Sequence, residues 1–131
     1  MSYVLSIEER PSYLHAKVSG RRSAENARRF LLEVHEAWTR RNCTALLLEM
    51  NLSGPSLSVL TIYNLIAERA PHAFGLRRIA YVEVGPGHDP AQARFAETVA
   101  RNRGVNVRLF PTVEDAAVWL GAEAGAERKV G

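Results

Sequence analysis

The chain has 131 residues, 47% of them hydrophobic, which is enough for one domain with its own core. Its 17 basic and 14 acidic residues give a net charge of +3, and no aromatic residues are interleaved with the basic ones, so we expect no nucleic-acid partner. The single cysteine, Cys43, excludes an internal disulfide. Without a secretory signal pattern or an apolar run of membrane-spanning length, the sequence predicts a cytoplasmic protein with no stable membrane insertion.

The first two elements predict a β-hairpin. Residues 3–8 and 13–18 both alternate between apolar and polar side chains, and residues 9–12 form a short turn that contains Pro11. We expect the first strand at the edge of a sheet, antiparallel to the second. A helix follows over residues 23–41, with Ser23 as its N-cap and an apolar stripe that repeats every three or four residues.

The middle of the chain predicts a buried strand that leads into an apolar helix. Residues 44–51 contain an unbroken apolar run, which is typical of a parallel strand covered on both faces. After the turn at 52–55, Ser56 or Ser58 opens a helix that ends near Ala70, before Pro71. This helix is apolar over much of its circumference, so it is either sandwiched in the core or exposes a binding face.

The remaining elements repeat the strand and helix alternation. Residues 79–84 predict a strand, Asp89 with Pro90 predicts a helix start, and Gly104 predicts its left-handed end. A strand over 105–110 and a helix over 112–121 complete the domain, and residues 122–131 are expected to be a flexible tail. The result is a single α/β domain over residues 1–121, with the order β-β-α-β-α-β-α-β-α. Its five-stranded sheet is mostly parallel, has an antiparallel edge strand and is packed by four helices.

Three stretches resemble the SpoIIAA-like group, which contains bacterial anti-sigma-factor antagonists and STAS domains. They are LLLEMNLSGPS (46–56), RRIAYVEV (77–84) and NRGVNVRLFPTVEDAAVWL (102–120), and the chain is most similar to the STAS-like branch. The resemblance implies a regulatory or protein-interaction module. The antagonists carry an Asp-Ser-Ser/Thr-Gly type motif with one phosphorylated serine, a place that Ser56 or Ser58 could hold. The preceding Asp and following Gly are absent here, so a serine that serves only as an N-cap is the alternative.

Polar side chains also collect where the predicted parallel strands end, which is the edge that usually faces a ligand. They are Glu49, Asn51, Ser53, Ser56, Glu83, His88 and Asp89. Glu49, Glu83 and His88 could together form an acid/base site, although strand-end carboxylates also occur as solvent-facing caps. We expect no cofactor and no metal, because no P-loop, nucleophile elbow or zinc-protease motif is present.

Three functions therefore remain open. The first is a module that binds a protein partner of unknown identity through the helix at 57–70, which contains Tyr63, and the loop before it. The second is a domain for a small anionic molecule or a lipid, with a pocket lined by Leu60, Asn64 and Glu83. The third is an enzyme that uses Glu49, Glu83 and His88. The sequence also leaves self-association open.

Overall fold

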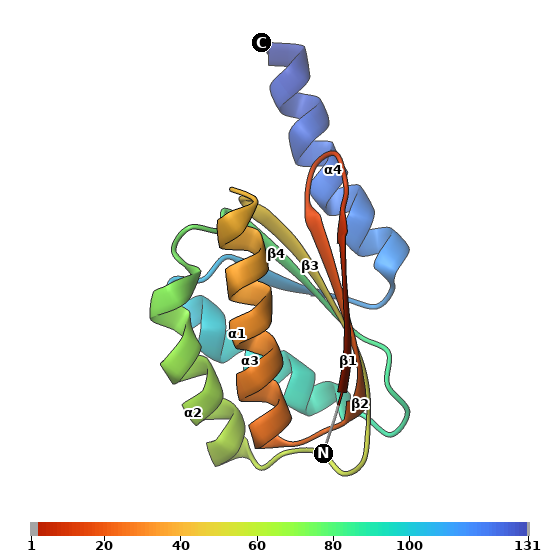
Figure 1. Ribbon diagram of the computed structural model, residues 1–131, viewed down its shortest axis with the longest axis vertical. Helices are drawn as coiled ribbons and strands as arrows, with labels where there is room; N and C mark the ends of the chain where they lie inside the picture. Colours follow the sequence, from red (N-terminus) through yellow and green to blue (C-terminus); the bar gives the residue numbers. More distant parts are fainter. Residues whose placement is uncertain (1–2, 131) are drawn as a thin grey trace.

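The computed structural model describes the backbone of residues 3–130 and the side chains of residues 3–121. One five-stranded sheet separates two helical layers of unequal size (Figure 1). The elements follow the predicted order, with a short 3-10 helix added after the second α-helix. The predicted α/β fold, mostly parallel with an antiparallel edge strand, is confirmed.

The hairpin forms as predicted, but its second strand is longer. β1 (Tyr3–Glu9) pairs antiparallel with β2 (Leu14–Arg21), and the turn is closed by a 2.9 Å bond from the Arg10 amide to the Tyr13 carbonyl. Gly20 does not end β2. Its φ of 138° is accommodated inside the strand, because β2 continues its pairing with β3 as far as Arg21.

The strands lie in the sheet in the order in which they occur in the chain. The parallel strands are β2, β3 (Ala45–Ser53), β4 (Arg78–Glu83) and β5 (Val107–Phe110). Right-handed crossovers that always step in the same direction place their helices on the same face of a sheet. The three crossover helices, α1 (Ala24–Arg40), α2 (Val59–Arg69) and α3 (Pro90–Asn102), accordingly cover one face (Figure 1). α4 (Val113–Val130) lies on the other face.

The crossover helices begin at side-chain caps. The Asn26 amide donates to Ser23 Oγ at 3.0 Å, and the Ala91 amide donates to Asp89 Oδ1 at 2.9 Å, so both predicted caps are confirmed. For α2 the sequence left two serines open. Ser58 is the cap, because its Oγ accepts from the Thr61 amide at 3.1 Å.

Two helix ends differ from expectation. α2 ends at Arg69 and passes into the 3-10 helix η1 (Ala70–Ala73). Pro71 lies in the first turn of η1, where a backbone N–H would have no partner within the helix, so the missing N–H of proline costs nothing there. α4 does not end at Gly121 but continues to Val130. Gly121 has no positive φ, and the alanine, glutamate and basic residues after it favour a helix. The predicted flexibility of 122–131 remains a prediction, and Gly131 lies outside the described residues.

The central strand β3 is buried on both faces, as its apolar run predicts. Leu46 is 4% exposed and packs in the layer of α1, whereas Leu47 is 0% exposed and packs against α4 with Val82 and Leu120. No helix in the described part of the chain combines the length and apolar character needed to cross a membrane.

Backbones approach closely where β3 and β4 end. A Cβ added to Gly85 would lie 2.1 Å from the carbonyl oxygen of Leu52, and Gly85 is buried. Only a residue without a side chain fits there. The neighbouring Val84 amide donates to the Met50 carbonyl at 2.8 Å, which ties the ends of the two strands together.

Candidate functional site

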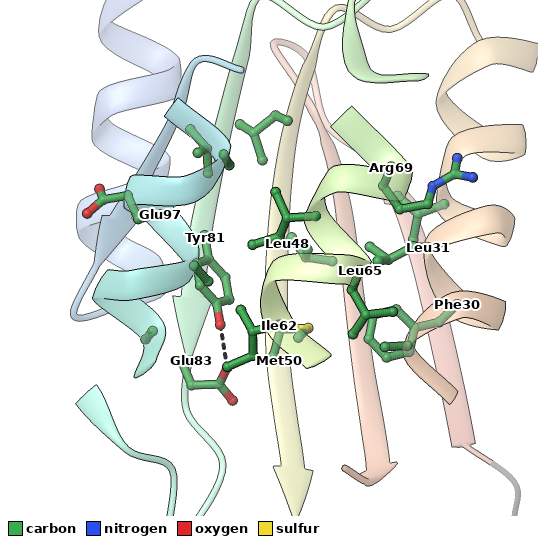
Figure 2. Close-up of a pocket in the computed structure, with 18 of the residues that line it drawn as sticks. Phe30, Leu31, Leu48, Met50, Ile62, Leu65, Arg69, Tyr81, Glu83 and Glu97 are labelled. Atoms are coloured by element: carbon green, nitrogen blue, oxygen red, sulfur yellow. Dashed lines mark hydrogen bonds between the residues drawn. The ribbon is translucent and has the colours of Figure 1, made fainter. Parts of the chain in front are cut away.

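A largely apolar cavity of about 280 Å³ lies between the sheet and the three crossover helices. Its lining from β3 is the row of side chains that points toward these helices, namely Leu46, Leu48, Met50 and Leu52. α2 covers it with Ile62, Leu65 and Ile66, and Figure 2 shows Ile62 and Leu65 facing the side chains of the sheet. The apolar lining suits a molecule with a hydrocarbon body.

Small side chains on α3 explain why the cavity is not filled. The residues by which α3 lines the cavity include Ala93, Ala96 and Ala100, which recur at three- and four-residue spacing and so share one face of the helix. Alanine fills far less of the gap between a helix and a sheet than leucine or phenylalanine does. The cavity therefore follows from the sequence of α3.

Three polar side chains meet at one end of the cavity. Tyr81 Oη donates a 2.7 Å hydrogen bond to Glu83 Oε2, drawn as a dashed line in Figure 2. Arg22 Nη2 lies 3.5 Å from Glu83 Oε1, and these two side chains are only 8% and 9% exposed. Glu83 Oε1 is buried, and no hydrogen-bond donor among the described residues reaches it. We call Arg22, Tyr81 and Glu83 the polar end of the cavity.

Arg22 and Tyr81 hold the polar end in place. The guanidinium of Arg22 donates to the carbonyls of Leu52, at 3.0 Å, and Gly54, so it links the segment before α1 to the end of β3 and the turn that follows. Burial, followed by the charge of Glu83, raises the pKa of Tyr81 far above its usual value. The hydroxyl therefore stays protonated and donates to the carboxylate.

The opposite end of the cavity contains an imidazole cluster. His35 packs edge-on against Trp38, with 5.0 Å between ring centroids, and 5.8 Å separates it from His72. All three rings, together with Arg69, line the cavity. Burial, then the charges of Arg69 and His72, lower the pKa of His35, so its ring is favoured in the neutral form.

The predicted acid/base site does not form, because Glu49 and Glu83 lie on opposite faces of the sheet. Met50, next to Glu49, is in register with Glu83, and both line the cavity. Glu49 itself is in register with Val82 on the α4 side. Strand side chains alternate between faces, so these two carboxylates cannot act on one substrate.

Glu49 has a different partner. Its Oε1 lies 2.8 Å from His15 Nε2, and the two side chains are 13% and 11% exposed. On the same strand, Asn51 is exposed and Ser53 Oγ donates to the Gly20 carbonyl at 3.2 Å. No group of three or more potential metal ligands occurs among the residues that the structure describes.

Three of the other predicted residues do border the cavity near Glu83, namely Ser56, His88 and Asp89. His88 Nδ1 donates to the Gly85 carbonyl at 2.9 Å, and Asp89 caps α3. The predicted lining by Leu60 and Asn64 is wrong, because both side chains are exposed on the outer side of α2. Of the proposed pocket residues only Glu83 is correctly placed.

α2 both covers the cavity and presents apolar side chains to solvent. Val59, Leu60 and Tyr63 are 53%, 68% and 43% exposed, and we call these three residues the outer α2 face. Tyr63 also contacts α3, since its hydroxyl accepts a 2.7 Å bond from Arg103, whose guanidinium lies 5.0 Å from the centre of the ring. α2 is therefore not sandwiched in the core; it packs on the sheet with one side and exposes apolar side chains on the other.

Sequence reasoning missed Arg22 and Tyr81. Arg22 stands between a strand and a helix, where a solvated arginine is common, and Tyr81 is one of several apolar strand residues. The only available signal was the alternation of side chains along β4, which puts Tyr81 and Glu83 on the same face of the sheet. This alternation does not indicate toward which face the Arg22 side chain points.

The architecture and the strand pairings define a SpoIIAA-like fold, and solved structures agree. The chain is similar to an uncharacterized protein of the DUF3478 family with a SpoIIAA-like fold from Shewanella loihica PV-4, with 17% identity, a TM-score of 0.56, and 90% of this chain and 93% of that chain covered. It is also similar to an anti-sigma factor antagonist from Mycobacterium paratuberculosis, with 18% identity, a TM-score of 0.60, and 91% and 94% covered. No protein-family model and no curated protein matches the sequence. The likeness confirms the predicted fold.

Proposed function

We propose that this chain is a non-enzymatic regulatory module that recognises a protein partner through the outer α2 face and the loop before it. The observation that carries this proposal is the exposure of Val59, Leu60 and Tyr63 on one helix. Apolar side chains gathered on a surface favour contact with another molecule, because burying them releases water. The fold shared with an anti-sigma factor antagonist supports a regulatory class.

Ser58 is the better candidate for a regulatory modification on this surface. It is exposed beside Val59, whereas Ser56 is half-buried at the cavity. A phosphate on Ser58 would lie at the N-terminus of α2, where backbone amides and the helix dipole stabilise negative charge. The Ser58 hydroxyl now donates to Thr61 Oγ1 at 2.8 Å, and phosphorylation would break this bond.

Leu60→Asp tests the proposal. Leu60 is the second residue of α2, where an acidic side chain favours the helix, so the variant is expected to fold. A partner would first be identified by cross-linking in extracts of the source cells, and its affinity would then be measured with purified proteins. We expect Leu60→Asp to weaken binding at least about tenfold, which is 1.4 kcal/mol, as for loss of a buried apolar contact.

Leu32→Asp is the matched control. Leu32 is 50% exposed, lies on α1, and is not part of the outer α2 face. This variant should bind the partner as the wild type does. Equal binding by Leu60→Asp and the wild type would contradict the proposal.

A second candidate function is the binding of a small, largely apolar molecule in the cavity beneath α2. A specific observation favours it, namely the volume of about 280 Å³ with an apolar lining and a buried polar end. Well-packed protein interiors contain few spaces larger than a water molecule, so an opening of this size is unusual for a core alone.

Ala96→Phe tests the second candidate by filling the cavity from α3. Binding of toluene would be followed by shifts of backbone amide signals in NMR spectra. The wild type should bind toluene, and Ala96→Phe should not, while Ala91→Phe, on an exposed position of the same helix, should bind like the wild type. Toluene binding by Ala96→Phe equal to that of the wild type would show that the cavity is not the site.

A further inference from the structure

The polar end of the cavity contains one oxygen that the protein leaves without a hydrogen bond. The side chain of Glu83 is 9% exposed and therefore 91% buried, and its Oε1 accepts no hydrogen bond from the described residues. A buried acceptor without a hydrogen bond destabilises the fold, and more so when the acceptor is charged. A bound group that donates to Oε1 would remove this cost.

The neighbouring groups favour a donor at this point. The hydroxyl proton of Tyr81 is already used by Glu83 Oε2, and Arg22 directs Nη1 and Nη2 to the backbone carbonyls of Gly54 and Leu52. The polar end therefore offers an acceptor that is ion-paired with Arg22 Nη2 at 3.5 Å but receives no hydrogen bond from the residues that the structure describes. A ligand whose polar atom could only accept a hydrogen bond would meet the carboxylate without a compensating contact.

The charges at the polar end favour a neutral group. Arg22 and Glu83 form an ion pair of opposite unit charges, with 3.5 Å between Nη2 and Oε1, so the site has almost no net charge to offer an ion. An ammonium group would lose its hydration and approach the guanidinium, and a carboxylate would lose its hydration and approach Glu83. A neutral hydroxyl loses less hydration free energy on burial than either ion does, and it still donates one hydrogen bond.

The rest of the cavity sets the size and character of the ligand body. At roughly 30 Å³ for each water-sized group, a volume of about 280 Å³ holds about nine non-hydrogen atoms. Beyond the polar end the body would lie between Leu48 and Met50 of β3 and Ile62 and Leu65 of α2, all of them apolar (Figure 2).

We propose that the cavity binds a neutral amphipathic molecule of about this size, whose terminal hydroxyl donates a hydrogen bond to Glu83 Oε1 and whose hydrocarbon chain runs beneath α2. This inference rests on the second candidate function and specifies its ligand class. It makes Glu83 a specificity-determining residue that selects a donor, in contrast to the catalytic acid or base that its position at a strand end suggested.

The experiment compares three probes on the wild-type protein by isothermal titration calorimetry. 1-Octanol and 1-methoxyheptane are isomers, but the ether cannot donate a hydrogen bond, and octanoate replaces the hydroxyl with a negative charge. We expect 1-octanol to bind at least about tenfold more tightly than either, as is typical of a hydrogen bond to a charged acceptor. This comparison needs no variant.

Glu83→Gln adds a second measurement. Its amide can turn a donor toward the cavity, so the preference for the alcohol over the ether should fall to about threefold or less. The matched control is Glu49→Gln, the same change on the neighbouring strand but on the opposite face of the sheet, which should keep the full preference.

The outcomes separate the two levels of the argument. If neither 1-octanol nor toluene binds the wild-type protein, the second candidate function itself is wrong, and this inference falls with it. If the ether or octanoate binds as tightly as 1-octanol, the cavity remains a binding site but the role of Glu83 is overturned. A preference for the alcohol that survives Glu83→Gln unchanged would also overturn that role.

Discussion

Replacing Gly85 with alanine tests how closely β3 and β4 approach at the end of the cavity. The new Cβ would lie 2.1 Å from the carbonyl oxygen and 2.6 Å from the amide nitrogen of Leu52. Non-bonded heavy atoms normally approach to about 3.5 Å, so the backbones would have to separate by more than about 1 Å. Both obstructing atoms belong to the backbone, and a change of rotamer therefore cannot relieve the clash.

The cost follows from two contributions. Forcing an extra carbon into a packed site costs about 1–3 kcal/mol. Separation of the strands would also break the 2.8 Å bond from the Val84 amide to the Met50 carbonyl, which contributes about 0.5–1.5 kcal/mol. We therefore expect Gly85→Ala to lower the free energy of unfolding by about 2–4 kcal/mol and the Tm by about 10 °C.

Urea denaturation followed by circular dichroism measures this loss. Gly121→Ala is the matched control, because Gly121 lies inside α4 and a Cβ there would meet, beyond its own helix, no heavy atom of the described residues within 4 Å. The same substitution should there stabilise the protein by about 0.5–1 kcal/mol through helix propensity. If Gly85→Ala proved as stable as the wild type within about 0.5 kcal/mol, the close approach of the two backbones would be refuted.

Three further predictions concern the caps and the polar end, and each can be checked by chemical denaturation. Ser58→Ala should cost about 1 kcal/mol because it removes the cap of α2, whereas Ser58→Gly should cost only a few tenths. Arg22→Met should cost about 3–5 kcal/mol by leaving the Glu83 carboxylate buried without its partner, and adding Glu83→Leu should recover part of this loss. The raised pKa of Tyr81 contributes stability that is complete below about pH 10, the ordinary pKa of tyrosine, so the free energy of unfolding should begin to fall near pH 10 and keep falling as the pH rises, less steeply in Tyr81→Phe.

Each of these predictions has an opposing result. Equal stability of Ser58→Ala and the wild type would mean that the Ser58 hydroxyl does not hold the first turn of α2. An Arg22→Met/Glu83→Leu protein less stable than Arg22→Met would show that the buried carboxylate is not the source of the loss. A fall in stability above about pH 10 that is identical in Tyr81→Phe and the wild type would assign the pH dependence to other groups.

The fold could be predicted because local signals agree with one another along the chain. The buried run around Leu46 and Leu47 requires cover on both faces, and the caps Ser23 and Asp89 mark where helices begin. Gly121 misled the prediction of a helix end, since a glycine permits termination but does not impose it when helix-forming residues follow.

The site could be predicted only in part, because it depends on register. The sequence correctly places Glu83 at the end of its strand, whereas Glu49 lies in the middle of β3, which continues to Ser53; whether the two share a face depends on how β3 and β4 align. A shift by one residue would exchange the faces. The cavity depends on the small alanines of α3 that line it, and its polar end depends on Arg22 reaching from the end of β2 to the Leu52 carbonyl. No pattern within a single element encodes these distances.

The agreement between the spatial and chain orders of the strands has a consequence for biosynthesis. After the β1–β2 hairpin, every strand pairs with the one made just before it, so the sheet can grow at one edge while translation proceeds. α4, which emerges last, is the element that covers Leu47 and Val82 on the second face. A nascent chain halted before Val113 would therefore contain all five strands but leave one apolar face of the sheet exposed, a form suited to capture by chaperones.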